Sequence, residues 1–174
     1  MSSFIIEGGH RLHGTIIPQG AKNEALQVLC ATLLTEDCVR IKNIPDILDV
    51  NNLIQLLADI GVEITVNGPN DMTFCARHIN ADYLQSETFY KRCSSLRGSI
   101  LLIGPCLARF GRTVVAQPGG DKIGRRRLDT HFYGISKLGA TFDYDEKLNI
   151  FNVQAPELKG TYMLLDEASV TGTA

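Results

Sequence analysis

LADIGVEI, residues 57–64, and ISKLGATF, residues 135–142, are two versions of one junction, in which an apolar helix passes through a glycine into a strand. Gly61 and Gly139 stand where helices commonly end in a left-handed residue, and an alternating apolar pattern follows each of them. Self-similarity of this kind is the mark of a repeated supersecondary unit. The junction therefore predicts an α/β fold built from repeats.

The periodicity on either side of each junction predicts the remaining elements of the two units. The first unit is expected to contain helices at 22–34 and 49–61 and strands at 38–43, 62–66 and 72–76. The second unit is expected to contain helices at 94–108 and 128–139 and strands at 113–117, 140–144 and 149–153, with Pro105 bending the end of its first helix. Residues 22–34 are apolar almost all round, which predicts a buried helix.

The spacing of the units predicts a third one. Lys22 lies 73 positions before Ser95, and Ser95 lies 74 positions before Ser169, within the segment LDEASVTGTA at 165–174. This segment is expected to begin the third unit after two full repeats at about 21–78 and 94–155. We therefore expect the chain to be part of a longer protein.

Composition describes a globular chain with no global preference for polyanions. The 174 residues are 44% hydrophobic with a net charge of −2, so neither nucleic acid nor an anionic membrane is an expected partner. No apolar run approaches the ~20 residues that cross a bilayer, and the start lacks the pattern of a signal peptide. The cytoplasm is the expected location, and the oligomeric state stays open.

The cysteines and histidines predict neither disulfides nor a metal site. The five cysteines form an odd set without a CxxC pair, which favours reduced, mostly buried thiols. The four histidines lack ligand spacing, apart from His10 and His13, which lie on a predicted edge segment.

The loop AQPGGDKIGRRR, residues 116–127, carries the strongest functional signal. It holds five residues more than the equivalent turn of the first unit, and insertions in repeat scaffolds are common sites of function. Its glycines permit close approach to a ligand, while Lys122 and Arg125 to Arg127 suit phosphate or carboxylate. These features predict a lid over an anionic substrate, against the alternative of a solvated basic surface loop. Asp121 is either an ion-pair partner within the loop or a general acid.

Three corresponding helix starts add polar and cationic groups. Lys22 and Asn23 stand at the start of the first helix, where free N–H groups and the helix dipole favour anions. Arg97 follows in the second unit, and Ser169 and Thr171 in the third. A plain helix cap is the alternative interpretation of each start taken singly.

Four motifs resemble a known family in order and spacing over essentially the whole chain. They are IIPQGAKNEAL at 16–26, SSLRGSILLIGPCLARFG at 94–111, QPGGDKIGRRRLDTH at 117–131 and LDEASVTGTA at 165–174. The family is that of the UDP-N-acetylglucosamine enolpyruvyltransferases (1-carboxyvinyltransferases). The resemblance implies an inside-out α/β barrel with buried helices and outer sheets, incomplete here because family members are about twice as long. It also implies that residues 1–20 are a strand segment of the other domain and that 21–174 belong to the enolpyruvyltransferase domain.

The resemblance further implies a reaction without metal or organic cofactor. The enolpyruvyl group of phosphoenolpyruvate passes to the 3-hydroxyl of UDP-N-acetylglucosamine in peptidoglycan precursor synthesis, and a portion of this length is expected to be inactive alone. Lys22 and Arg126 would hold phosphoenolpyruvate, and Asn23 and Arg97 would order both substrates. The residues implied for the sugar nucleotide are Arg126, Arg127, Leu128, Asp129 and Thr130 at its uridine end and Ser169, Val170 and Thr171 at its diphosphate.

Asp121 occupies the place where most family members carry a cysteine. The resemblance therefore makes Asp121 the candidate general acid and implies insensitivity to fosfomycin, which alkylates that cysteine. Two alternative functions stay open. One is the related 3-phosphoshikimate 1-carboxyvinyltransferase activity, and the other is a non-catalytic anion-binding module.

Overall fold

The computed structural model describes residues 3–116, 128–165 and 173. The first unit follows the predicted order of elements closely. It consists of α1 (Lys22–Ala31) with the 3-10 turn η1 (Thr32–Leu34), β1 (Cys38–Lys42), α2 (Leu48–Ile60), β2 (Glu63–Gly68) and β3 (Asp71–Cys75).

The second unit repeats this order, with a 3-10 turn and an α-helix added at its start. It consists of η2 (Tyr83–Gln85), α3 (Glu87–Ser95), η3 (Arg97–Leu102), α4 (Ile103–Phe110), β4 (Arg112–Ala116), α5 (Asp129–Lys137), β5 (Thr141–Asp145) and β6 (Ile150–Gln154). Each unit folds its three strands into one antiparallel sheet. The strand order is β1-β3-β2 in the first sheet and β4-β6-β5 in the second, so the last strand of each unit is central in both.

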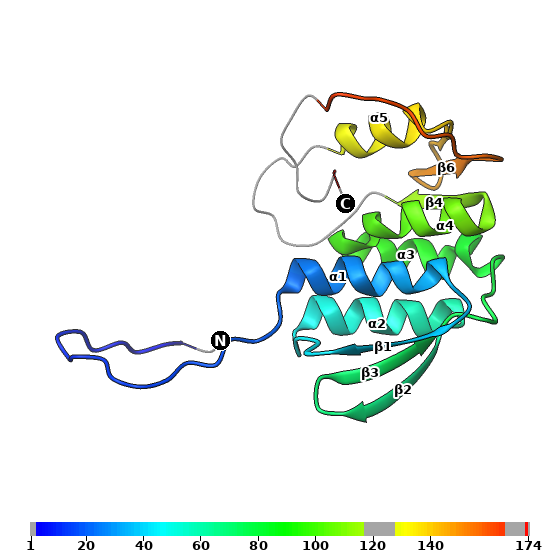
Figure 1. The fold of residues 1–174 in the computed structure, drawn as a ribbon. Coiled ribbons are helices and arrows are strands. Elements are labelled where there is room, and N and C mark those ends of the chain that lie inside the picture. The colour runs from blue at the N-terminus through cyan, green and yellow to red at the C-terminus, as the bar shows by residue number, and fades with distance from the viewer. Residues whose placement is uncertain (1–2, 117–127, 166–172, 174) are drawn as a thin grey trace.

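The helices lie inside and the first sheet lies outside, as the sequence predicts for this fold class. Figure 1 shows α1 to α4 stacked over the first sheet. Helix α5 packs with α4 against the second sheet, in a cluster that includes Ile103, Phe132 and Val153. The core is richest along α2, where Leu53, Leu57 and Ile60 are fully buried. A helix with this much apolar surface is stable mainly through packing, because isolated helices of its length are marginal in water.

Gly61 and Gly139 confirm the junction predicted from the sequence. Their φ angles are 110° and 108°, in the left-handed region. Each also lies against a later part of its unit. A Cβ atom would come within 2.6 Å of the His78 carbonyl oxygen at Gly61 and within 3.2 Å of the Glu157 carbonyl oxygen at Gly139.

The prediction of a single helix over 94–108 is wrong. The segment forms the end of α3, then η3, and then α4, which runs to Phe110. Pro105 lies in the first turn of α4 instead of bending a helix end, because a residue there needs no N–H for the helix. The expectation of a buried helix at 22–34 is confirmed for residues such as Leu26, Leu29 and Leu33, whereas Val28 in α1 and Leu34 in η1 are exposed.

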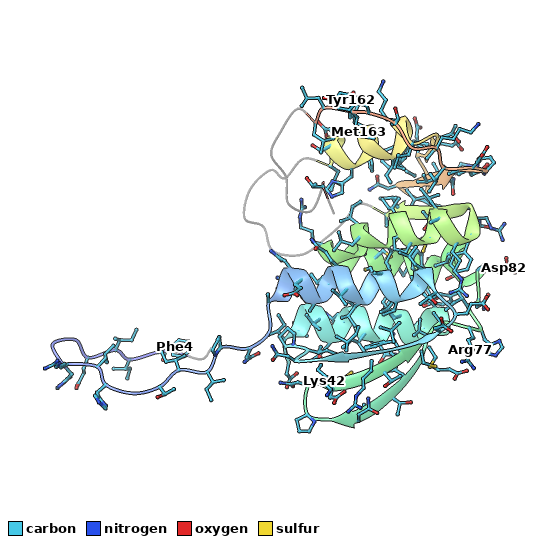
Figure 2. All side chains as sticks on the ribbon, viewed as in Figure 1. Phe4, Lys42, Arg77, Asp82, Tyr162 and Met163 are labelled. Carbon is cyan, nitrogen blue, oxygen red and sulfur yellow. A yellow bond between two sulfur atoms is a disulfide. The ribbon has the colours of Figure 1, made fainter. Side chains whose placement is uncertain are left out.

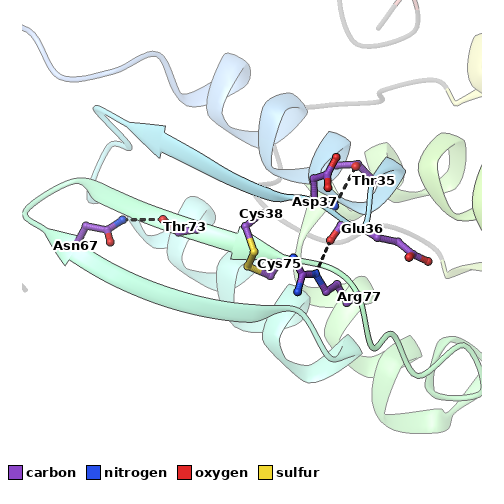
Figure 3. The surroundings of a disulfide bond; sticks show 8 residues. All are labelled: Thr35, Glu36, Asp37, Cys38, Asn67, Thr73, Cys75 and Arg77. Carbon is purple, nitrogen blue, oxygen red and sulfur yellow. Dashed lines mark hydrogen bonds between the residues drawn. A yellow bond between two sulfur atoms is a disulfide. The ribbon is translucent and has the colours of Figure 1, made fainter.

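The expectation that all five cysteines are reduced is wrong for two of them. Cys38 and Cys75 form a disulfide across β1 and β3, with their Cα atoms 4.3 Å apart (Figure 3). The two positions are register partners although 37 residues separate them in the chain. Cys30, Cys93 and Cys106 are buried thiols, as expected.

Residues 3–20 extend away from the body of the molecule (Figure 1). They contain no strand in the structure, and Phe4 near the beginning, labelled in Figure 2, is 95% exposed. A strand needs a neighbour to pair with, so the assignment of this segment to a second domain stays a prediction. Within the described residues, no helix is both long and apolar enough to span a bilayer.

Candidate functional site

Gly20 sets where α1 begins. A Cβ atom at position 20 would lie 2.1 Å from the carbonyl oxygen of Asn43 and 3.3 Å from Cδ of Pro45. Glycine is required because no other residue permits this approach of two backbones. The contact places the start of α1 against the turn that leads into α2.

Lys22 is the first residue of α1, and its ammonium group forms an ion pair with the carboxylate of Asp49. Asp49 lies in the first turn of α2, so the pair joins the starts of the two helices. Both side chains are nearly half exposed, and pairs of this kind contribute only ~0–1 kcal/mol to stability. The pair therefore orients the ammonium group more than it stabilises the fold.

The start of α1 also offers backbone donors. Ala21 precedes the helix without a side-chain cap, and the first N–H groups of any α-helix lack carbonyl partners within it. Asn23 lies in the same turn with an exposed side chain. An exposed ammonium, an amide and unpaired N–H groups together suit an anion such as phosphate or carboxylate.

Arg97 approaches the same helix from the second unit. It is half buried at the first position of η3, and the next residue, Gly98, packs against α1. A Cβ atom at Gly98 would lie 3.1 Å from Cδ1 of Leu26, one turn after Lys22. The fold thus brings Arg97 next to the first half of α1, as the sequence predicts from the corresponding helix starts.

Leu128, Asp129 and Thr130 form the start of α5. Leu128 is the residue before the helix and packs with Phe132 in the second core cluster, while Thr130 is 2% exposed. Leu128 also lines a depression of about 310 Å³ beside the end of β4. Of this group, Asp129 is exposed and Leu128 partly so.

The remaining candidate residues lie outside the described part of the chain. They are Asp121, Arg126, Arg127, Ser169, Val170 and Thr171. Their predicted roles stay predictions.

The described candidates gather at one end of the molecule. The first turns of α1, α2 and α5 lie on the same side in Figure 1, because each strand that precedes α2 or α5 runs back to the side where the previous helix began. Helix N-termini carry partial positive charge, so this end favours anions.

A larger apolar groove lies elsewhere. It has a volume of about 640 Å³ and runs between α1, α4 and α5, with Leu34, Ile103 and Leu138 among its walls. None of the six described candidate residues lines it, and its apolar walls do not fit a phosphate. We therefore place the candidate site at the helix starts.

Sequence reasoning missed Asp49, and a signal for it was present. The pair Leu-Asp occurs at the start of α2, as Leu48 and Asp49, and at the start of α5, where Leu128 precedes the helix and Asp129 is its first residue. Among the described residues, no group of three or more His, Cys, Asp or Glu side chains is placed to hold a metal ion.

The fold is that of the enolpyruvyl transferases. The structure of the enolpyruvyl transferase NikO from Streptomyces tendae superposes with a TM-score of 0.64 at 21% identity, over 87% of this chain and 32% of that one. An EPSP synthase from Acinetobacter baumannii gives a TM-score of 0.57 at 13% identity, over 91% of this chain and 36% of that one.

Sequence comparisons identify the family within this class of fold. The family model of EPSP synthase (3-phosphoshikimate 1-carboxyvinyltransferase) matches residues 6–174, and the chain belongs to this family. Proteins named UDP-N-acetylglucosamine 1-carboxyvinyltransferase are 63% identical in Bacteroides fragilis and 56% identical in Porphyromonas gingivalis over all 174 residues. The chain spans 40% of the length of these relatives.

Proposed function

We propose that this chain is the part of a UDP-N-acetylglucosamine 1-carboxyvinyltransferase that supplies one wall of the active site and its loop acid. The observation that carries the proposal is the 56–63% identity, along the whole chain, to relatives with that name. The cationic helix starts support it, because both substrates of the reaction are anions.

Lys22 would hold phosphoenolpyruvate together with Arg126. The ammonium group of Lys22 lies at the start of α1, and its partner Asp49 keeps it there in the absence of substrate. Since the pair is exposed and weak, a doubly charged phosphate can replace the carboxylate as the partner of Lys22 at small cost. Asn23 and Arg97, which the fold brings to the same helix, would order the two substrates.

Asp121 would act as the general acid. In the proposed reaction the 3-hydroxyl of the sugar adds to C2 of phosphoenolpyruvate while a proton is delivered to C3, and phosphate then leaves. A carboxyl group donates this proton near neutral pH only if its pKa is raised, and a bound anionic substrate has that effect. The base that accepts the hydroxyl proton is expected outside residues 1–174.

The sugar nucleotide would bind at the start of α5 and along the third unit. Arg126, Arg127, Leu128, Asp129 and Thr130 would contact its uridine end, and Ser169, Val170 and Thr171 its diphosphate. The exposure of Leu128 and Asp129 at the same end of the molecule as Lys22 supports this placement. The cytoplasm is the expected location of the reaction.

The rival function is transfer of the enolpyruvyl group to shikimate 3-phosphate, the activity after which the matching family model is named. The test uses a protein of the relatives' full length that includes this sequence. Phosphate release from phosphoenolpyruvate is measured with UDP-N-acetylglucosamine and, separately, with shikimate 3-phosphate. Release with UDP-N-acetylglucosamine alone supports the proposal, release with shikimate 3-phosphate alone supports the rival, and release with neither supports an anion-binding module.

A further inference from the structure

The outer face of the first sheet carries a pair of sulfur atoms that the proposed function does not use. Cys38 opens β1 and Cys75 closes β3, and the two residues are opposite each other in the antiparallel register. Their Cα atoms are 4.3 Å apart. This distance is typical of opposite residues that share no backbone hydrogen bonds, and the side chains of such pairs come closest together. The fold therefore brings two cysteines into bonding distance without any local sequence motif.

This pair is accessible from solvent. Along β1, Cys38, Arg40 and Lys42 are exposed, whereas Val39 and Ile41 alternate with them and are partly buried. Ile41 packs against the main core cluster. Cys38 is exposed and Cys75 half buried. Exposed disulfides are the ones that small thiols reach, in contrast to disulfides within a core.

The neighbouring contacts hold the two strands together whether or not the sulfur atoms are bonded. Arg40 donates two hydrogen bonds to the carboxylate of Asp71, at 2.8 Å and 2.7 Å, at the other end of the β1–β3 pair. Those hydrogen bonds hold the pKa of Asp71 below its usual value, so the ion pair persists at neutral pH.

A second contact closes the end beside the disulfide. Nε of Arg77, two residues after Cys75, donates to the carbonyl oxygen of Glu36, two residues before Cys38, at 3.1 Å (Figure 3). Two thiols released at this place therefore stay opposite each other and can form the bond again.

The three other cysteines provide an internal contrast. Burial raises the pKa of the Cys93 and Cys106 thiols to about 12, and it also raises the pKa of Cys30. Since the thiolate is the reacting form, these thiols are inert while the protein is folded.

We propose that Cys38 and Cys75 are a reversible thiol–disulfide exchange site for small thiols such as glutathione, separate from the substrate site. A glutathione thiolate attacks one sulfur of the pair, which breaks the Cys38–Cys75 bond, forms a mixed disulfide and releases the other sulfur as a thiolate. A second glutathione then displaces the protein sulfur. The pair gains two electrons and two protons, and two glutathione molecules become one glutathione disulfide.

The experiment equilibrates the folded protein with glutathione and glutathione disulfide over a range of ratios. Accessible thiols are then trapped with N-ethylmaleimide under native conditions, and the protein is analysed by intact mass and peptide mapping. We expect the labels to rise from none to two as the ratio becomes reducing, to sit on Cys38 and Cys75, and to return to none on reoxidation. Denatured and reduced protein should take five labels within residues 1–174.

Two single variants check the assignment. Cys38→Ser and Cys75→Ser each leave one accessible thiol, and each should form a mixed disulfide with one glutathione. Labels on Cys30, Cys93 or Cys106 in the folded protein would overturn the proposal. So would a Cys38–Cys75 pair that stays fully reduced or fully oxidised at every ratio.

Discussion

Lys22 is the described residue on which the proposed phosphoenolpyruvate site depends most. In a protein of the relatives' full length, Lys22→Ala should raise KM for phosphoenolpyruvate about tenfold or more and leave KM for the sugar nucleotide within a few-fold. The reason is that a charge-assisted contact to an anion contributes ~1.5–3 kcal/mol. Steady-state kinetics with each substrate varied in turn measures the effect.

Lys42→Ala is the matched control for this variant. Lys42 is also exposed, but it lies at the end of β1 on the outer sheet. Lys42→Ala should change neither the KM for phosphoenolpyruvate nor the KM for the sugar nucleotide. Equal losses for both substrates in Lys22→Ala would contradict the assigned role.

A separate prediction at the scale of single residues concerns Asp121. Asp121→Asn keeps the size of the side chain but removes the transferable proton, so kcat should fall by ~10²- to 10⁴-fold. Asp121→Cys should keep turnover and become sensitive to fosfomycin, since a thiolate attacks an epoxide far better than a carboxylate does. Time-dependent loss of activity, together with intact mass, measures the adduct. A covalent adduct on the protein with Asp121 intact would refute the prediction.

At the scale of secondary-structure elements, Gly20 determines how α1 packs against the turn before α2. Gly20→Ala places a Cβ atom 2.1 Å from the Asn43 carbonyl oxygen, and the backbones must separate. Overpacking of this kind costs ~1–3 kcal/mol, and urea denaturation should show it. Gly160→Ala is the control, since no atom lies within 4 Å of a Cβ at that position. If both variants matched the unchanged protein in stability, the close approach at Gly20 would be refuted.

The disulfide is the second prediction about elements. Cys38→Ser combined with Cys75→Ser should lower the free energy of unfolding by ~2–4 kcal/mol, because the bond closes a loop between residues 37 apart. Guanidinium denaturation of the oxidised protein measures the loss. The control is the same comparison in dithiothreitol, where the difference should disappear. A difference of equal size under both conditions would mean that the serine side chains, and not the lost bond, are responsible.

At the scale of the whole molecule, the buried thiols predict alkaline sensitivity. Burial raises the pKa of Cys93 and Cys106 from 9.0 to about 12, so the folded state disfavours their ionisation. Each raised pKa adds a contribution to the free energy of unfolding that is fully present below pH 9 and is lost as the pH rises toward 12. The free energy of unfolding should therefore fall above pH 9, by at most ~1.4 kcal/mol per thiol and pH unit.

Urea titrations from pH 8 to pH 11 measure this slope. Cys106→Ala should flatten it, whatever the variant does to stability at pH 8. The double serine variant at positions 38 and 75 is the control and should leave the slope unchanged, since disulfide sulfur does not titrate. An unchanged slope in Cys106→Ala would exclude this thiol as a source of the alkaline loss.

The sequence by itself determined the elements and their repetition. Helix periodicity, the turns and the left-handed glycines at 61 and 139 depend on near neighbours in the chain, so the pattern was sufficient to predict them. The boundary between α3, η3 and α4 escaped prediction, and in this segment Gly98 packs closely against Leu26 of α1, which is distant in the chain. Local pattern carries no information about such a contact.

Only the tertiary structure decided which distant side chains meet. Lys22 and Asp49 are 27 residues apart, and Cys38 and Cys75 are 37 apart. The ion pair depends on the close contact at Gly20 that aligns the starts of α1 and α2, and the disulfide depends on the register of β1 with β3. Register and helix packing are set by burial of the shared core, and a change of one residue in register would turn Cys38 to the opposite face. The candidate lysine was therefore predictable from the sequence, whereas its partner and the sulfur pair were not.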